Sequence, residues 1–221
     1  MLAAGADPHH HHHPQPRLPD HGQHDPTATP RVLTVVSRVL EKLVARNDQL
    51  SSGAAGGRLR SFDGVRPPSI SLEKYVERIY KYTGCSPSCF VVGFVYIDRL
   101  VHRFPDSPVA SLNVHRLVIT GVMVASKILD DIHYNNAFYA RVGGISNTEL
   151  NKLELELLFL LDYGVSVSPR VFESYCEHLE KQMLLCGIGR PTAITNGSLD
   201  DVTEISIEDS AQSSSPPILV D

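Results

Sequence analysis

The chain has 221 residues, of which 42% are hydrophobic and 20% charged, with a net charge of −5 and no tryptophan. These values are ordinary for a water-soluble globular protein with one or two domains. The longest apolar stretch, residues 117–129, is interrupted by Lys127 and falls short of the roughly 20 apolar residues that a membrane span needs. We therefore expect a soluble protein without a membrane partner.

Charge is distributed unevenly along the chain. Residues 1–68 carry 8 basic and 6 acidic side chains, residues 69–185 carry 11 and 13, and residues 186–221 carry 1 and 6. The acidity therefore lies in the last segment, and the middle segment is almost neutral. No run of Lys and Arg supplies the basic footprint of a nucleic-acid-binding protein, so we expect no nucleic-acid partner.

Cysteines and histidines lack the spacing of a disulfide framework or a metal site. The four cysteines form no Cys-x-x-Cys pair and no secretory signal precedes them, which favours reduced thiols in an intracellular protein. A run of five histidines, residues 9–13, could be a metal-binding tract or part of a purification tag. Its Pro- and His-rich surroundings favour a low-complexity tail instead. We expect no structural metal and no cofactor.

The first 68 residues contain one predicted helix. Residues 1–30 have little to bury and are expected to be disordered. Apolar residues then recur at helical spacing from Val32 to Leu43, which predicts an amphipathic helix over residues 31–47 that needs a partner surface. Residues 48–68 contain a Ser/Gly/Ala-rich stretch and the pair Pro67-Pro68, and are predicted to be a linker.

Residues 69–185 read as consecutive helices with no alternating strand pattern, so the predicted fold class is all-α. The expected helices cover about residues 71–83, 87–103, 114–129, 135–142, 146–161 and 168–186. The second and third are apolar on nearly every face, which in a soluble protein places them at the centre of the others. Residues 186–221 lack a core-forming pattern and are predicted to be a disordered acidic tail.

Several helix ends are marked by local sequence. Ser86-Pro87 and Ser168-Pro169 are typical of an N-cap followed by proline at the first helical position. Gly84 is a stop signal for the first of these helices. Ser146 and Glu149 have the spacing of a capping box, in which each side chain binds an otherwise unpaired backbone N–H.

Four short motifs on these helices resemble the signatures of the cyclin box, in cyclin order. They are Tyr96-Ile97-Asp98-Arg99, Ala125-Ser126-Lys127, Leu153-Glu154 and Leu160-Leu161-Asp162-Tyr163. The sequence of residues 94–100 and 151–154 is most similar to that of the plant P-type, or U-type, cyclins, which are related to fungal phosphate-pathway cyclins. The resemblance covers about residues 69–180. It implies a single five-helix cyclin box, preceded by the helix at 31–47 and followed by one further helix.

The resemblance implies a regulatory subunit, not an enzyme, that binds and activates a cyclin-dependent protein kinase. It places the family's two kinase-contacting positions on Lys127 and Glu154. From the residues alone, Lys127 could instead extend to solvent from the end of its helix, and Glu154 could belong to a solvated helix face. Neighbours on a helix do not face each other, so Asp98 and Arg99 are expected to make different structural contacts within the box.

Other features bear on regulation and substrate choice. Thr29-Pro30 and Ser215-Pro216 fit the minimal proline-directed phosphorylation pattern in the predicted tails, which makes Thr29 and Ser215 candidate phosphosites. The first box helix lacks the Met-Arg-x-x-Leu patch and the tryptophan of many mitotic cyclins. Too few residues follow Leu161 for a second box, so we expect a single-box cyclin.

Alternative functions have less support in the sequence. No P-loop, GxGxxG, HExxH or nucleophile-elbow motif is present, so an enzyme with a small-molecule substrate is disfavoured. A cyclin-fold module that binds nucleic acid would need a basic face. The sequence does not separate control of cell division from a role in nutrient signalling, such as phosphate status, and it is compatible with location in the nucleus, the cytoplasm or both.

Overall fold

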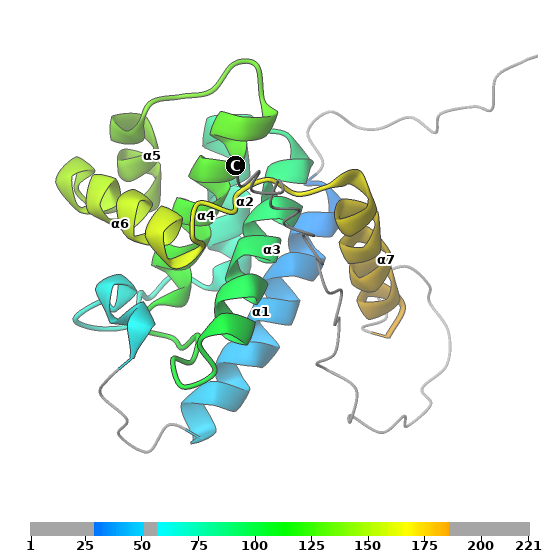
Figure 1. The fold of residues 1–221 in the computed structure, drawn as a ribbon, viewed down its shortest axis with the longest axis horizontal. Coiled ribbons are helices and arrows are strands. Elements are labelled where there is room, and N and C mark those ends of the chain that lie inside the picture. The colour runs from blue at the N-terminus through cyan, green and yellow to red at the C-terminus, as the bar shows by residue number, and fades with distance from the viewer. Residues whose placement is uncertain (1–28, 51–56, 186–221) are drawn as a thin grey trace, which may run out of the picture.

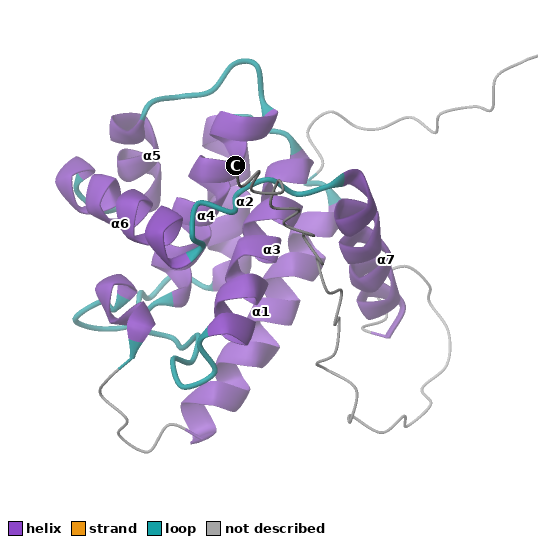
Figure 2. Ribbon diagram, viewed as in Figure 1, coloured by secondary structure: helices purple, strands orange, loops and turns teal. Residues whose placement is uncertain are grey.

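The computed structural model describes residues 29–50 and 57–185, and these residues form helices and loops without a strand (Figure 2). The predicted all-α fold is confirmed. The helices are α1 (Arg31–Leu50), the 3-10 helix η1 (Arg58–Phe62), α2 (Leu72–Thr83), α3 (Pro87–Arg103), α4 (Val114–Leu129), α5 (Asn136–Gly143), α6 (Asn147–Leu160) and α7 (Pro169–Leu185). Helices α2 to α6 are the five helices of the expected box.

Helices α3 and α4 form the centre of the molecule, and their backbones touch (Figure 1). A Cβ atom added to Gly93 would lie 3.2 Å from the backbone nitrogen of Val122, and one added to Gly121 would lie 3.3 Å from the carbonyl oxygen of Gly93. Two glycines that face each other therefore allow a closer approach than any other residue pair. This explains why both helices are buried on almost every face, as their sequences predict.

The remaining helices cover this central pair from two sides. Helices α2, α5 and α6 pack around α4, whereas α1 and α7 pack against α3 and against each other. In Figure 1, α7 lies on the side of α3 opposite α5 and α6. The amphipathic face of α1 buries Leu33, Val36 and Leu40, which supplies the partner surface that its sequence pattern requires.

The segment predicted as a linker, residues 48–68, contains ordered structure that the sequence pattern did not predict. Helix α1 continues to Leu50, and the 3-10 helix Arg58–Phe62 buries Leu59 and Phe62 completely in the core. The backbone N–H of Arg58 donates to Ser107 Oγ at 2.7 Å, and that of Gly64 donates to the Leu112 carbonyl at 2.8 Å. Two apolar residues in a five-residue turn create no periodicity, so composition alone suggested a linker.

The helix ends follow the capping signals with two differences. Ser86 stands at the N-cap of α3 but makes no side-chain capping bond, and its Oγ atom lies 3.3 Å from Cys89 Sγ. Ser71, Asn135 and Ser146 each accept a hydrogen bond from a backbone N–H in the first turn of α2, α5 and α6. Glu149, however, does not complete the capping box predicted with Ser146. Its Oε1 atom instead accepts a hydrogen bond of 2.6 Å from Arg116 Nε, because a charged donor is a stronger partner than a backbone amide.

The chain after α6 is held against α3. Asp162 and Tyr163 have positive φ angles of 52° and 57°, which turn the backbone sharply at the end of α6. Tyr96 Oη then donates to the Val165 carbonyl at 2.7 Å, and Arg99 donates to the Gly164 carbonyl at 2.7 Å. These bonds direct the chain back across α3, where α7 begins.

Some expectations fall wholly or partly outside the described residues. The His9–His13 run, Ser215 and the acidic segment from residue 186 onward lie there. Thr29 was predicted to lie in the tail but is among the described residues, where it is half-buried two residues before α1. The adjacent Pro30 carbonyl accepts a hydrogen bond from the Leu33 N–H. Within residues 29–50 and 57–185, no helix has both the length and the apolar composition to cross a membrane.

The close approach of α3 and α4 makes Gly93→Ala a test of the fold. Alanine favours a helix over glycine by about 0.5–1 kcal/mol, but its Cβ would press on the backbone of α4, and overpacking costs about 1–3 kcal/mol. We expect a net loss of stability and a melting temperature lower by at least ~2 °C. Thr148→Ala, at an exposed position of α6, is the control and should change the melting temperature little. An unchanged or raised melting temperature for Gly93→Ala would show that the helices can separate without loss.

Candidate partner-binding surface

Lys127 and Glu154 form an ion pair that joins α4 to α6. Lys127 Nζ lies 2.6 Å from Glu154 Oε1, and the two side chains are 29% and 18% exposed. The sequence singled out both residues but did not predict that they bind each other. Lys127 therefore neither extends freely into solvent nor stands alone in an apolar helix, and Glu154 is not part of a solvated face.

Asn136, at the start of α5, completes this cluster. Its Nδ2 atom donates to Glu154 Oε2 at 2.6 Å and to Asn151 Oδ1 at 2.8 Å. Both carboxylate oxygens of Glu154 are thus bonded, one to a lysine from α4 and one to an asparagine from α5. Three helices meet at one carboxylate, which fixes the side-chain rotamer of Glu154. Sequence reasoning missed Asn136, because an asparagine at a helix start ordinarily indicates only a cap.

The loop after α4 is anchored by Asp130. Its Oδ2 atom accepts hydrogen bonds from the Ser86 N–H at 3.2 Å and from Cys89 Sγ at 3.3 Å, both at the start of α3. The end of α4 is therefore held to the start of α3, and the loop leaves from a fixed point. Tyr134, within this loop, stacks on Phe138 of α5 with ring centroids 3.9 Å apart.

Exposed apolar side chains flank the ion pair in sequence. They come from the end of α4, the loop that follows it and the outer face of α6, and each is at least 44% exposed: Ile128, Leu129, Ile132, Tyr134, Leu155 and Phe159. Two of them directly follow Lys127, and Leu155 directly follows Glu154. We call these six residues together with Lys127 and Glu154 the α4–α6 surface. Exposed apolar residues on the elements that carry a partly buried charge pair are typical of a protein interface.

Asp98 and Arg99 lie elsewhere and contact different partners. Asp98 Oδ2 accepts a hydrogen bond of 2.6 Å from Tyr175 of α7 and lies 3.3 Å from His102 Nδ1. Arg99 donates to the carbonyls of Gly164 and Ser166, between α6 and α7. Burial, reinforced by the Asp98 carboxylate, raises the pKa of the Tyr175 phenol, so this group remains a donor. Both residues of the motif thus hold α7 and the segment before it.

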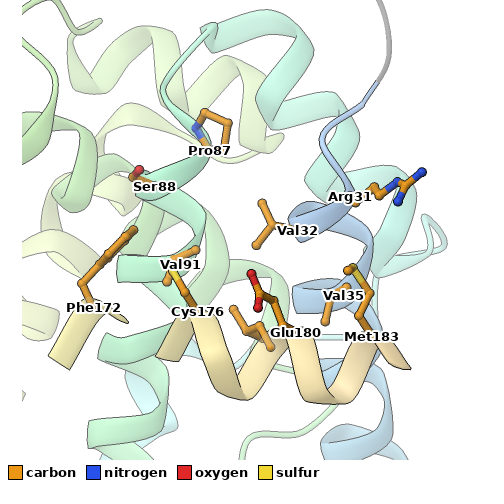
Figure 3. Close-up of a pocket in the computed structure, with 11 residues that line it drawn as sticks. Arg31, Val32, Val35, Pro87, Ser88, Val91, Phe172, Cys176, Glu180 and Met183 are labelled. Atoms are coloured by element: carbon orange, nitrogen blue, oxygen red, sulfur yellow. The ribbon is translucent and has the colours of Figure 1, made fainter. Parts of the chain in front are cut away.

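Away from the α4–α6 surface, a concavity lies between α1, the start of α3 and α7 (Figure 3). Its volume is about 300 Å³, and its lining is mostly apolar, including Val32, Val91 and Phe172. Cys176 also lines it, but burial, together with the nearby Glu180 and Glu173, raises the pKa of this thiol, which therefore stays protonated at neutral pH. Among the described residues, no group of three His, Cys, Asp or Glu side chains could hold a metal ion.

Comparisons with known proteins agree with this arrangement of helices and motifs. Residues 30–165 match the family model "Cyclin". The chain is 70% identical to Cyclin-U1-1 of Arabidopsis thaliana over 160 residues, which cover 72% of this chain and 76% of that protein. It is 48% identical to Cyclin-U4-1 of the same plant, over 73% of this chain and 80% of that protein.

A rice relative carries the second name of the plant group. Cyclin-P1-1 of Oryza sativa subsp. japonica is 48% identical over 161 residues, covering 68% of this chain and 61% of that protein. The family match begins at residue 30, so it includes α1 and η1 as well as the box helices, and it ends at residue 165, before α7. The match spans more than half of the chain, and the resemblance read from the four motifs is confirmed: this chain belongs to the cyclin family and is similar to the plant U-type and P-type cyclins.

Proposed function

We propose that this cyclin binds and activates a cyclin-dependent serine/threonine protein kinase through its α4–α6 surface and thereby controls cell division. The observation that carries the proposal is the Lys127–Glu154 pair, set among exposed apolar side chains at the two positions that the family motif assigns to kinase contact. Family membership supports a kinase partner in general. Such a complex would act in the nucleus, the cytoplasm or both.

The α4–α6 surface has the chemistry of a stable interface. Its apolar side chains would gain about 25 cal/mol for each Å² removed from water, and a specific contact of standard size buries about 1,600 Å² in total. The Lys127 ammonium has three donors, of which Glu154 takes one. The other two could bind backbone carbonyls of a kinase helix end, which has carbonyl groups without a helical partner.

The cluster is also held in place before a partner arrives. Because Lys127, Asn136 and Glu154 bond to one another, their rotamers are fixed in the free chain. Binding then costs less side-chain entropy than it would for a free lysine and a free glutamate. The ion pair is therefore better suited to shape a contact surface than to stabilise the fold, since a partly exposed pair contributes little to folding.

Activation follows from preferential binding. A protein kinase is active only when the lysine of its third strand pairs with a glutamate of its C helix. A subunit that binds the inward position of this helix more tightly than the outward position shifts the kinase toward the active arrangement by that difference in affinity. In this mechanism the cyclin contributes no catalytic group.

The first prediction tests the function itself. The purified chain alone should transfer no phosphate from ATP, whereas a cyclin-dependent kinase isolated with it from the native tissue should lose activity when the chain is removed and regain it when the chain is returned. Phosphorylation of a generic serine/threonine substrate with radiolabelled ATP measures both. Kinase activity that is independent of the added chain would contradict the proposal.

The second prediction separates a kinase contact from a structural bond at the ion pair. In the exchange variant Lys127→Glu/Glu154→Lys, the two charges can still pair, although Asn136 loses the carboxylate that accepts its bond, so the melting temperature should fall no further than that of Glu154→Ala. The charges presented to the kinase are reversed, and loss of a buried interfacial pair costs about 2–5 kcal/mol. Binding should therefore weaken roughly 30-fold or more, as measured by titration calorimetry.

Single substitutions serve as the control for this exchange. Lys127→Ala and Glu154→Ala each remove the ion pair but not the packing of α6 on α4, so each should lower stability slightly while also weakening kinase binding. If the exchange variant folds and binds the kinase as tightly as the parent does, the kinase does not contact these charges. The transfer of the family's contact positions would then be wrong.

The third prediction concerns the apolar part of the surface. Leu155→Ser/Phe159→Ser replaces two exposed side chains on the outer face of α6, so folding should be preserved while kinase binding weakens at least ~10-fold. Leu184→Ser/Leu185→Ser likewise replaces two exposed apolar side chains, on α7, and should leave binding unchanged. Surface plasmon resonance against the immobilised kinase compares the two. Equal losses for both pairs would mean that α6 has no special role.

A further inference from the structure

A second polar site lies at the opposite end of α4 from Lys127. There the segment of residues 66–70, the middle of α2, the start of α4 and the end of α5 enclose an open cavity of about 730 Å³. Helix α4 has 16 residues and is therefore roughly 24 Å long. The cavity and the Lys127–Glu154 pair are thus separate features of the molecule.

The charge of the cavity lining is entirely positive. Arg66, Arg78 and Arg116 contribute to it, and its lining contains no aspartate or glutamate. These arginines come from three segments far apart in the sequence, so no run of basic residues reveals them. The sequence lacks a basic cluster, but the fold assembles one.

Two of the arginines are held in position by one bond each. Arg116 Nε donates to Glu149 at 2.6 Å, and Arg78 Nε donates to the Val142 carbonyl at 2.9 Å. The Arg78 guanidinium also lies 5.7 Å from the centre of the Tyr82 ring. A guanidinium has five N–H donors, so each of these bonds leaves several for a ligand. Fixed guanidinium groups bind an anion with little loss of rotamer entropy.

His115 is not one of the anion-binding donors of this cavity. It lines the cavity, and its Nε2 atom is 3.0 Å from the Ile70 carbonyl, but its buried Nδ1 atom has no hydrogen-bond partner. Burial, together with the positive charge of Arg116, lowers the pKa of this imidazole, which is therefore neutral at pH 7. The proton of this ring faces the Ile70 carbonyl, so Nδ1 is an acceptor, and the donors available to an anion are those of the arginines.

We propose that this cavity binds a phosphate monoester carried on a peptide, that is, a phosphorylated serine or threonine of a partner protein. A phosphomonoester has a charge of about −1.5 to −2 and three acceptor oxygens, which matches several guanidinium forks better than a single carboxylate does. The volume exceeds that of a phosphate group, and the apolar side chains Ile70, Val142 and Ile145 in the lining can contact the residues beside it. The proposal does not rest on kinase binding.

The test uses the full chain and a library of short peptides with a central phosphothreonine or phosphoserine, read out by fluorescence polarisation at physiological salt. We expect the phosphorylated library to bind at least ~10-fold more tightly than the same library without phosphate. Arg66→Ala/Arg78→Ala should lose at least ~10-fold in affinity for the phosphorylated library. Arg38→Ala/Arg60→Ala removes two exposed arginines outside the cavity and should stay within ~2-fold of the parent.

Further measurements separate the outcomes. Arg66→Ala/Arg78→Ala should bind the kinase as the parent does, and if this double variant is destabilised, Arg66→Ala alone, at an exposed position, is used instead. Equal binding of phosphorylated and unphosphorylated peptides, or of peptides with glutamate in place of the phosphoresidue, would overturn the proposal. Inorganic phosphate that binds as tightly as the peptides would also overturn the proposal, because the ligand would then be the free anion. Unchanged affinity of the double variant for the phosphorylated library would overturn it as well.

Discussion

The contact between Gly93 and Gly121 is the constraint on which the rest of the structure depends. Because the backbones of α3 and α4 touch there, neither helix has a free face at the crossing, and every other helix must pack around the pair. The arrangement needs two residues without a Cβ atom, in two helices that are otherwise among the most apolar in the described chain. Loss of either glycine would move apart the two elements that position everything else.

Helix α4 then carries a different polar cluster at each end. Near its start, Arg116 binds Glu149 of α6, and near its end, Lys127 binds Glu154 of the same helix. These two bonds hold the first turn and the middle of α6 against the two ends of α4, which fixes the outer face of α6 relative to the core. The pair at Lys127 has exposed apolar residues next to it in the sequence of both helices, whereas the pair at Arg116 borders a cavity lined by further arginines.

The sequence predicted what depends on local pattern and missed what depends on distant contacts. Helical periodicity, caps and glycine stops are set within a few residues, so the helices were predicted close to their observed bounds. Lys127 and Glu154 were identified by resemblance to the cyclin box, yet their bond to each other was not, since it joins residues 27 positions apart. Glu149 shows the same limit, because its predicted capping role is replaced by a bond to Arg116 across 33 positions.

The two helices outside the box explain why the α4–α6 surface remains open. Helices α1 and α7 cover α3, and α7 is held there by the Tyr175–Asp98 bond and by the bonds of Tyr96 and Arg99 to the preceding segment. Within residues 29–50 and 57–185, α2, α5 and α6 cover the other side of the central pair, and the apolar side chains on the outer face of α6 stay exposed. Exposed apolar residues on that second side gain nothing from folding. Their retention beside a fixed charge pair is instead what a surface built for a protein partner requires.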